Sequence, residues 1–386
     1  MLALSASLQY SDAATLKVLY SFTGGSDGGS PNAALIMDTR RDLYGTTYLV
    51  NGYTAGTVFK LSRNGVETVL HTFVGGTGGS QPGGLFMDAK GSLWGTTCCG
   101  GNANGCGVVF RITAKGDEKL VHTFTGEPND GCTAFAALIT GRHKNFYGTT
   151  TGGGKDNEGS VFKMAQSNSE VILHSFGFQH GGNYPLAGLL LNASGNFLGV
   201  DEGGGAKKSG TVFELDPNGR EKVLYAFKGA ANDGSEPDGT LIADLSGNLY
   251  GTLLIGGRAG CEGNEGCGAV FELAPDGTET ILHFFTGKKG DGGNPVGGVI
   301  ADGAGNLYGT TNYGGGPCSM DIYGCGTAYK IGPDGSETIL FSFSKSDGTN
   351  GAYPIAGLLL DGFGNLYGTA RGGGAYGYGT VFEITP

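Results

Sequence analysis

The stretch "GNLYGTT", from Gly305 to Thr311, decides the fold because the chain repeats it. "GNLYGT" also stands at 247–252 and 364–369, and looser copies are "RDLYGTT" from Arg41, "GSLWGTT" from Gly91, "KNFYGTT" from Lys144 and "GNFLGV" from Gly195. The aromatic position of this word recurs at intervals of 50 to 59 residues, at Tyr44, Trp94, Tyr147, Leu198, Tyr250, Tyr308 and Tyr367. A period of this length indicates a repeat protein.

Three further words separate successive copies, always in the same order. They are represented by "GTVFKL" from Gly56, "ETVLHTF" from Glu67 and "PLAGLLLN" from Pro185. Each word has four to eight residues, is rich in β-branched and aromatic residues, and is bounded by Gly, Asn or Asp, so each predicts a β-strand. Four strands at a period near 50, repeated seven times, predict an all-β protein: a seven-bladed β-propeller with four-stranded antiparallel blades.

The two ends of the chain predict how the ring closes. The repeats begin with "TLKVLYSF" at 15–22, a relative of "ETVLHTF", and end with "GTVFEITP" from Gly379, a relative of "GTVFKL". The N-terminal word is therefore the missing fourth strand of the last blade, and this three-plus-one closure leaves no exposed sheet edge. We expect residues 15–386 to form a single propeller and residues 1–14 to be the remnant of an N-terminal leader.

The loops predict which face carries a site. We name the strands of a blade a ("AGLLLD"), b ("NLYGTT"), c ("TVFKL") and d ("VLHSF"). The a–b and c–d turns are tight and carry Asp-Gly or Asn-Gly, as in "DGAGN" from Asp302 and "DPNGR" from Asp216. The b–c and d–a loops are long, Gly-rich and variable. We call the two ends of the blades the turn face and the loop face, and we expect the functional site on the loop face.

Composition excludes several function classes. The net charge of −11 and only 24 Lys plus Arg argue against binding to nucleic acid or to an anionic membrane, which require a basic face. No apolar run approaches the roughly 18 residues of a membrane span. Glycine contributes 79 residues, but it lies between β-rich words, and 39% of the residues are hydrophobic, enough for a packed core. We expect a monomer.

The order of "GNLYGTT", a Gly-rich loop, "GTVFKL", "VLHSF" and "DG..P" resembles the GloVer-type tandem-repeat proteins. These are bacterial surface or secreted proteins that often carry a C-terminal anchoring signal. The resemblance covers the chain from about residue 15, although "EITP" at its end shows no such anchor. It implies a secreted or cell-surface location and no common activity.

Eight cysteines favour an oxidising compartment. Three of them stand just before strand c, each with a candidate partner a few residues upstream in the same b–c loop. The expected disulfides are Cys99–Cys106, Cys261–Cys267 and Cys318–Cys325. For Cys98 and Cys132, an inter-blade bridge is one interpretation, and competition of Cys98 with Cys99 for Cys106 is the other. We expect no metal site, because the cysteines are spread over several blades without a nearby His.

Two repeated positions have structural interpretations. The position before the end of strand d accepts His, Tyr or Phe, which indicates a space-filling role between sheets, at His71, His122, His174, His283, Tyr20, Tyr225 and Phe341. The d–a loop usually carries Asp-Gly, at Asp27, Asp130, Asp233, Asp291 and Asp347. An Asp that caps its own backbone is the simpler interpretation, and a repeated cation or ligand site is the alternative.

The fourth blade departs from the pattern at two places on the loop face. His180 stands where other d–a loops carry Asp, and "GNFLGVDEGGG" replaces "YGTT", which introduces Asp201 and Glu202. These residues and Tyr184 are thereby brought to one region, where they provide an acid and a base. Adjacent strand residues point to opposite faces of a sheet, so a true pair needs a carboxylate from another blade. Drift of one blade is the alternative.

The position of Glu202 is filled by different residues in the other blades: Tyr48, Cys98, Thr151, Leu254, Asn312 and Arg371. Aromatic rings with scattered acids and amides suit sugars, which stack on rings and need hydrogen-bonding partners. We therefore expect a polysaccharide or oligosaccharide as the partner. The candidate catalytic residues are Asp201, Glu202 and His180, and the candidate substrate-binding residues are Tyr184, Arg371, Tyr48 and Asn312.

Two functional classes follow from these residues. One is a carbohydrate-active enzyme, either a glycoside hydrolase with paired carboxylates or a polysaccharide lyase with a His or Tyr base. The other is a non-catalytic surface module that binds glycan or protein. One divergent blade favours the enzyme, and the similarity of the other blades favours the module. We expect no cofactor, because the glycine runs join strand to strand and offer no helix N-terminus to a phosphate, and a structural calcium ion has no support in the sequence.

Overall fold

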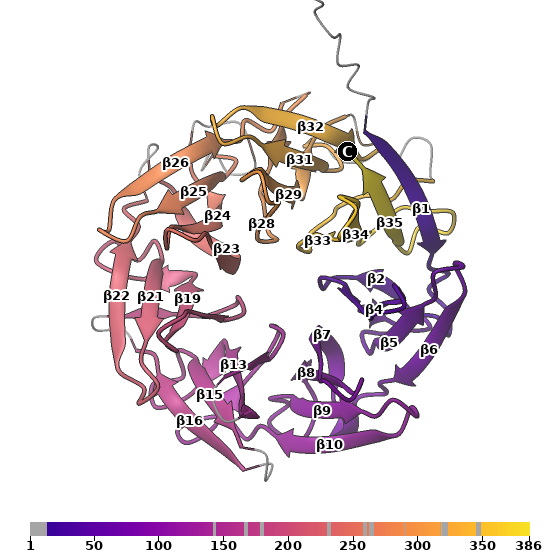
Figure 1. Ribbon diagram of the computed structural model, residues 1–386. Coiled ribbons are helices and arrows are strands. Elements are labelled where there is room, and N and C mark those ends of the chain that lie inside the picture. Colours follow the sequence, from indigo (N-terminus) through magenta and orange to yellow (C-terminus); the bar gives the residue numbers. More distant parts are fainter. Residues whose placement is uncertain are drawn as a thin grey trace, which may run out of the picture.

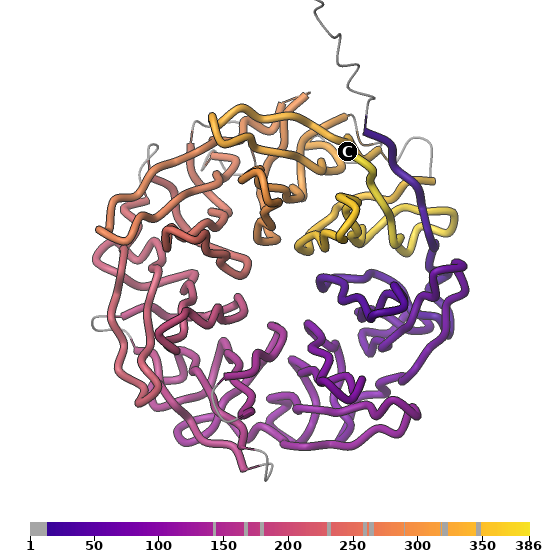
Figure 2. The backbone as a smooth tube through the Cα atoms, viewed as in Figure 1, coloured from indigo at the N-terminus to yellow at the C-terminus, as the bar shows by residue number. Residues whose placement is uncertain are grey.

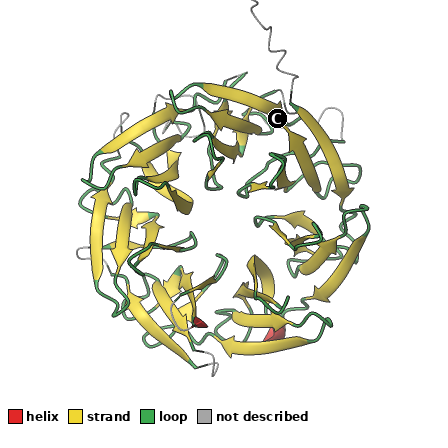
Figure 3. Cartoon of the chain, viewed as in Figure 1, coloured by secondary structure: helices red, strands yellow, loops and turns green. Residues whose placement is uncertain are grey.

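The computed structural model describes residues 14–141, 144–165, 169–177, 181–229, 233–257, 261, 266–288, 290–316, 318, 323–344 and 349–386. Seven antiparallel blades surround a central channel, as predicted (Figure 1). The backbone trace places the first and the last strand of the ring side by side (Figure 2), and strands and loops make up almost all of the described chain (Figure 3). No helix in the described part of the chain is long and apolar enough to span a membrane.

In each of the first three blades, the strands follow one another from the channel outward. Blade one has β2 (Gly29–Pro31), β3 (Ile36–Met37), β4 (Leu43–Leu49), β5 (Thr57–Leu61) and β6 (Glu67–Thr72). The turn η1 (Gly76–Gly78) precedes blade two, with β7 (Ser80–Met87), β8 (Leu93–Cys99), β9 (Val108–Ile112) and β10 (Glu118–Thr123). Blade three has β12 (Ile139–Thr140), β13 (Phe146–Thr150), β15 (Ser160–Met164) and β16 (Glu170–Ser175), with the loop-face pair β11 (Gly131–Cys132) and β14 (Gly152–Gly153).

The remaining blades follow the same order. Blade four has β18 (Leu190–Leu191), β19 (Phe197–Asp201), β21 (Thr211–Leu215) and β22 (Glu221–Ala226), with β17 (Gly182–Asn183) and β20 (Gly203–Gly204) on the loop face. Blade five has β23 (Ser235–Ala243), β24 (Leu249–Ile255), β25 (Ala269–Leu273) and β26 (Glu279–Phe284). Blade six has β28 (Ile300–Ala301), β29 (Leu307–Thr311), β31 (Thr327–Ile331) and β32 (Glu337–Ser342), with β27 (Gly292–Gly293) and β30 (Tyr313–Gly314). Blade seven has β33 (Leu359–Leu360), β34 (Leu366–Ala370), β35 (Thr380–Thr385) and β1 (Thr15–Ser21).

The ring closes through the N-terminal strand, as the sequence predicts. β1 pairs antiparallel with β35, with Leu16 opposite Ile384 and Ser21 opposite Thr380. β1 is thus the outer strand of a blade whose other three strands are at the C-terminus. Because both ends of the chain share one sheet, blade seven couples the two ends of the repeat array.

The repeated word of strand b owes its Tyr to hydrogen bonding and its following Gly to packing. In blade one, the Tyr44 hydroxyl donates to Asp38 Oδ2 in the a–b turn at 3.1 Å. A Cβ at Gly45 would lie 2.7 Å from Phe59 Cζ and 2.9 Å from Leu35 Cδ2, so only glycine leaves room for the aromatic ring of strand c. The same contact recurs at the six equivalent glycines: Gly95, Gly148, Gly199, Gly251, Gly309 and Gly368.

The two threonines of the word bond in different directions. Thr46 Oγ1 donates to the carbonyl of Gly83 in the next blade at 3.1 Å. Thr47 Oγ1 lies 2.8 Å from Thr57 Oγ1 within the blade. The first threonine therefore joins blades and the second joins strands b and c, since successive strand residues face opposite sides of the sheet.

Seven aromatic pairs hold neighbouring blades together. The last Phe of strand d packs with the aromatic residue of strand c in the next blade, with ring centroids 5.0–5.2 Å apart. The pairs are Phe22–Phe59, Phe73–Phe110, Phe124–Phe162, Phe176–Phe213, Phe227–Phe271, Phe285–Tyr329 and Phe343–Phe382. Such pairs contribute roughly 0.5–1.5 kcal/mol each beyond their area burial. The ring is therefore closed by one contact used seven times.

Candidate functional site

The channel opens on the loop face inside a ring of residues with left-handed backbone. In each blade the non-glycine residue two positions before the channel-lining part of strand a has φ between 52° and 64°: Ser30, Gln81, Thr133, Tyr184, Glu236, Asn294 and Tyr353. Each of their N–H groups donates to a carbonyl just before strand c of the preceding blade, at 2.6–3.0 Å. Non-glycine residues rarely adopt this conformation, and backbone strain of this kind clusters at functional sites. We call these seven residues the mouth ring.

A second set of side chains stands beside the mouth ring, at the end of strand b. The N–H of Glu202 donates to the carbonyl of Tyr184 at 3.2 Å, and the N–H of Arg371 donates to that of Tyr353 at 3.1 Å. Asn312 makes the equivalent bond to Asn294 at 3.0 Å. The candidate position of Glu202 thus lies directly against the mouth ring in each of these blades.

Three carboxyl groups from two blades, Glu202, Glu236 and Asp238, interact electrostatically near the mouth. Glu202 of blade four acts electrostatically on Asp238 of blade five, and so does Glu236 of the mouth ring. The pKa of Asp238 is raised to about 7, chiefly by burial; the bond from the Gly239 N–H opposes the shift, and the charges of Glu202 and Glu236 contribute to it. Burial also raises the pKa of Glu202. The second carboxylate that a true pair requires therefore comes from blade five.

Asp238 is distinctive within the channel itself. The channel has a volume of about 510 Å³ and is lined by strand a of all seven blades. Among the described residues that line it, Asp238 is the one ionisable side chain, while most are Ala, Gly, Val, Leu, Ile or Phe. Asn32 of blade one also lines the channel, and its buried Oδ1 has no hydrogen-bond partner among the described residues. The channel thus combines an apolar wall with one titratable group near the loop face.

Asp201 lies inside blade four and not at the mouth. Its side chain is fully buried, and its Oδ2 accepts a bond from Thr211 Oγ1 at 2.8 Å. It replaces the second threonine of the word, so it takes the place that Thr47 has beside Thr57. Burial raises the pKa of Asp201 well above its usual range, and Glu221 adds to the effect. Asp201 and Glu202 point in opposite directions, as strand geometry requires.

The other candidate residues are spread around the mouth. Tyr184 belongs to the mouth ring and is 43% exposed. Burial raises the pKa of Tyr48 in blade one. Cys98 and Cys99 of blade two also raise this pKa, and Arg371 of blade seven lowers it. Tyr48 is therefore a neighbour of both adjacent blades at the mouth. Asn312 lies in blade six. His180 lies outside the described residues.

Sequence reasoning missed Glu236 and Asp238, although a signal was present. Both belong to "EPDGTLI" from Glu236, the blade-five copy of strand a. At the position of Asp238 the other blades carry Asn32, Gly83, Phe135, Leu186, Val296 and Ile355. A comparison of the strand a words, and not only of the strand b words, would have identified the departure.

The disulfides partly follow the prediction. Cys261–Cys267 and Cys318–Cys325 are confirmed. The predicted Cys99–Cys106 bridge and the Cys98–Cys132 alternative are wrong, because Cys106 pairs with Cys132 of the next blade, with their Cα atoms 4.3 Å apart. The mouth ring explains this pairing, since the Thr133 N–H donates to the Cys106 carbonyl at 2.9 Å and brings the neighbouring Cys132 against Cys106.

Cys98 and Cys99 are free in the structure and lie at the mouth. Their Sγ atoms are 2.7 Å apart, and Cys98 Sγ donates to Gln81 Oε1 at 3.1 Å. Burial raises the pKa of Cys98, and Cys99 raises it further. The thiol of Cys98 is therefore held in its neutral form.

The His, Tyr or Phe position of strand d is not simply space-filling, because it lies near the start of strand d in the next blade, where six blades have Glu as the first residue and β1 has Leu16 as the second. The seven facing pairs are Tyr20–Glu67, His71–Glu118, His122–Glu170, His174–Glu221, Tyr225–Glu279, His283–Glu337 and Phe341–Leu16. We call them the junction pairs. In six of them a buried Glu oxygen has no hydrogen-bond partner among the described residues.

Two junctions have donor sets that could hold a metal ion. His122, Asp130 and Glu170 offer ligand atoms within 4.8 Å of one another, and so do His283, Asp291 and Glu337. At two other junctions a Tyr hydroxyl donates to the Asp in place of His, from Tyr20 to Asp27 and from Tyr225 to Asp233. At those two junctions the Tyr hydroxyl makes the hydrogen bond to Asp that His makes elsewhere. Hydrogen bonding is therefore sufficient to explain the two clusters, and we assign them no metal.

Four-stranded blades, a channel open on a loop-bearing face and a three-plus-one closure define a seven-bladed β-propeller. Within that class, the chain matches the family described as the Gloeobacter/Verrucomicrobia repeat over residues 8–141, 53–262 and 257–386. These matches extend over nearly the whole chain, and the protein belongs to this family. No curated protein sequence matches it.

Solved structures with the same architecture include an enzyme and sensor domains. Virginiamycin B lyase from Staphylococcus aureus superposes with a TM-score of 0.62 at 11% identity, over 97% of this chain and 99% of the lyase. The extracellular domain of a hybrid two-component system from B. thetaiotaomicron gives a TM-score of 0.59 at 12% identity. That match covers 96% of this chain, which spans 41% of the sensor chain. At such identities the likeness establishes the fold and not an activity.

Proposed function

We propose that the protein is a secreted glycoside hydrolase that cleaves an extracellular polysaccharide at the loop-face mouth of its channel. The observation that supports the proposal is Asp238, an ionisable side chain in an otherwise apolar channel, together with the electrostatic effect that Glu202 of the adjacent blade and Glu236 have on it. The disulfides support an extracellular location, because they persist in oxidising compartments.

The pKa of Asp238, raised to about 7, assigns the roles in the proposed reaction. A carboxyl group that is still partly protonated at neutral pH can donate a proton to the glycosidic oxygen as that bond breaks. Glu202 is then the carboxylate that activates a water molecule or attacks the sugar directly. Tyr184, exposed beside Glu202, offers a ring face on which a sugar stacks.

The mouth ring suits this task because its backbone is fixed. Each member is bonded through its N–H to the preceding blade, so its side chain leaves the rim from a constrained position. Tyr184, Tyr353 and Asn294 belong to this ring, and Tyr48, Asn312 and Arg371 stand at the neighbouring strand b positions. We propose that these residues hold successive sugars of a chain that lies across the mouth.

The test is a screen of polysaccharides for new reducing ends, with a parallel assay for unsaturated products. On a cleaved substrate, Asp238→Asn and Glu202→Gln should each lower kcat by about 10²–10⁴-fold, the usual contribution of general acid–base catalysis. Glu214→Gln is the matched control, since Glu214 binds the amides of Asn192 and Asn196 at the turn-face end of blade four. Equal rates for all three variants, with unchanged melting temperatures, would place the chemistry elsewhere.

A non-catalytic glycan-binding module is the second candidate. It is favoured by the mouth ring, which presents a side chain at the same position in all seven blades. Binding of several glycans without cleavage of any would support this function and overturn the hydrolase. Unsaturated products would instead indicate β-elimination and a different base.

A further inference from the structure

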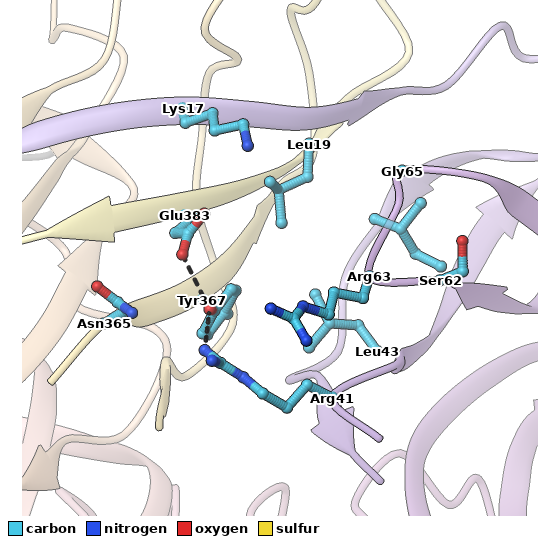
Figure 4. Close-up of a pocket in the computed structure, with 11 residues that line it drawn as sticks. Lys17, Leu19, Arg41, Leu43, Ser62, Arg63, Gly65, Asn365, Tyr367 and Glu383 are labelled. Atoms are coloured by element: carbon cyan, nitrogen blue, oxygen red, sulfur yellow. Dashed lines mark hydrogen bonds between the residues drawn. The ribbon is translucent and has the colours of Figure 1, made fainter. Parts of the chain in front are cut away.

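A pocket of about 270 Å³ lies on the turn face at the seam where the ring closes, on the opposite side from the mouth. It is bounded by β1, β34 and β35 of blade seven and by the a–b and c–d turns of blade one (Figure 4). Three cationic side chains line it: Lys17, Arg41 and Arg63. This cationic cluster stands out on a chain with a net charge of −11.

Arg41 occupies a position that normally requires glycine. Its φ of 66° is left-handed, and five other blades have glycine at this point of the a–b turn: Gly91, Gly195, Gly247, Gly305 and Gly364. The Arg41 guanidinium crosses the seam and donates to Asp361 and, at 3.0 Å, to the Tyr367 hydroxyl. Arg41 therefore forms one wall of the pocket and is neutralised by blade seven.

Lys17 and Arg63 are not neutralised in this way. Among the described residues, neither side chain forms an ion pair or a hydrogen bond. Figure 4 shows the Lys17 ammonium extending downward from β1 and the Arg63 guanidinium extending inward from blade one, beside the Arg41 side chain. At the position of Arg63 three other blades have proline, at Pro217, Pro275 and Pro333. The turn itself therefore does not require an arginine there.

The charge balance of the seam leaves the pocket positive. The three cations face one carboxylate in the lining, Glu383, whose Oε1 already accepts a bond from Tyr367 at 2.9 Å. The three positive charges of Lys17, Arg41 and Arg63 thus face two negative charges, those of Glu383 and Asp361, which leaves one positive charge in excess. Arginine and lysine that converge in a pocket provide charge-assisted donors that match the oxygens of sulfate, phosphate or a carboxylate. We propose that this seam pocket binds an oxyanionic group, carried by a small ligand or by an acidic sugar.

The proposal can be tested by calorimetric titration at low ionic strength with three probes: sulfate, phosphate and glucuronate. Saturable binding is expected, and Arg63→Gln and Lys17→Gln should each weaken it about tenfold, since each removes a charged donor to the anion. Lys119→Gln is the matched control, because Lys119 stands at the position of Lys17 in strand d of blade two. Lys115→Gln, in the c–d turn of that blade, is the control for Arg63 and should leave the affinity unchanged.

The probes distinguish the two sources of the oxyanion. Tighter binding of glucuronate than of sulfate or phosphate indicates an acidic sugar, and the reverse order indicates a small tetrahedral anion. Selenate diffused into crystals gives a second measurement that needs no variant, and its anomalous signal should lie between Lys17 and Arg63. Absence of saturable binding, equal affinity of Arg63→Gln and Lys115→Gln, or a selenate site elsewhere would each overturn the proposal. None of these outcomes depends on the hydrolase activity, which concerns the other face.

Discussion

The junction pairs and the mouth ring are built from the same seven repeats, yet they vary in opposite ways. At the junctions, the first residue of strand d is Glu in six blades, and its partner is always His or Tyr. In the mouth ring, the backbone conformation and the inter-blade hydrogen bond are the same in all seven blades, but the side chains differ. Tyr is the one residue type that occurs twice among the seven. Repetition of side chains therefore marks contacts between blades, and variation on a fixed backbone is the pattern expected of the surface that we propose binds a ligand.

The one exception among the junctions supports this distinction. At the junction of blades six and seven, Phe341 faces Leu16, and both pack on one hydrophobic cluster. Glu and its polar partner are thus replaced together by two apolar residues. The junction depends on a match between the two sides and not on a particular chemical group, because an unmatched buried carboxylate is costly.

The largest expected effect comes from opening the ring. Removal of residues 1–22 deletes β1, exposes the edge of β35 and takes away one aromatic blade contact, Phe22 with Phe59. We expect the loss of cooperative folding, which amounts to the whole stability of roughly 5–15 kcal/mol. Far-ultraviolet circular dichroism and gel filtration will detect it.

A permutant provides the control for this truncation. In blade six, "IGP" at 331–333 is followed by Asp-Gly-Ser at 334–336 and then by strand d. The last three residues of the chain, "ITP", match this "IGP". In the permutant, Asp-Gly-Ser and then residues 16–22 are therefore attached after Pro386. This chain keeps the register of Leu16 opposite Ile384 and should fold. A folded truncation, or an unfolded permutant, would contradict the role assigned to the closure.

A smaller effect is expected from changing one side of a junction. Glu337 Oε2 lies 3.5 Å from His283 Nε2, so Glu337→Leu leaves a partly buried imidazole without this partner and should cost about 1–2 kcal/mol. The double variant His283→Phe, Glu337→Leu copies the natural pair Phe341–Leu16 and should recover at least half of this loss. Urea unfolding midpoints measure both. A double variant that is less stable than the sum of its single changes would contradict matched junctions.

The sequence predicted those parts of the molecule that repeat. Blade number, strand order and closure follow from words that recur at one period, because each word makes the same packing and hydrogen-bonding contacts. Glu202 was singled out as a departure in strand b, and its role stays a prediction. Asp238 and the Cys106–Cys132 bridge were not predicted, because both depend on how one blade approaches the next. The twist of the ring determines that approach, and no single repeat contains it.

The smallest expected effect is a dependence of stability on pH, and it distinguishes the junctions from the mouth. Burial raises the pKa of Glu67, Glu170, Glu279 and Glu337 from 4.5 to about 7. The aspartates that face them add to the shift in each case, while His122, Lys228 and His283 oppose it at their own junctions. A group whose pKa is higher in the folded state contributes stability that is complete below its unfolded pKa and is lost as the pH rises through the folded pKa.

The melting temperature should therefore fall between pH 5 and pH 8, by an amount equivalent to about 1 kcal/mol per junction. The pKa of His283 is raised by Asp291 and Glu337 against the effect of burial, so its contribution has the same sign. The lowered pKa of Asp130 and of Asp291 acts only at more acid pH. Replacing the four glutamates by Gln should make the profile shallower, because an amide has no proton to lose, and the raised pKa values of Asp201 and Asp238 account for the slope that remains. Glu202→Gln at the mouth should change the profile by a quarter of that amount or less. A melting temperature that rises from pH 5 to pH 8 would show that the junction glutamates are ionised in the folded protein.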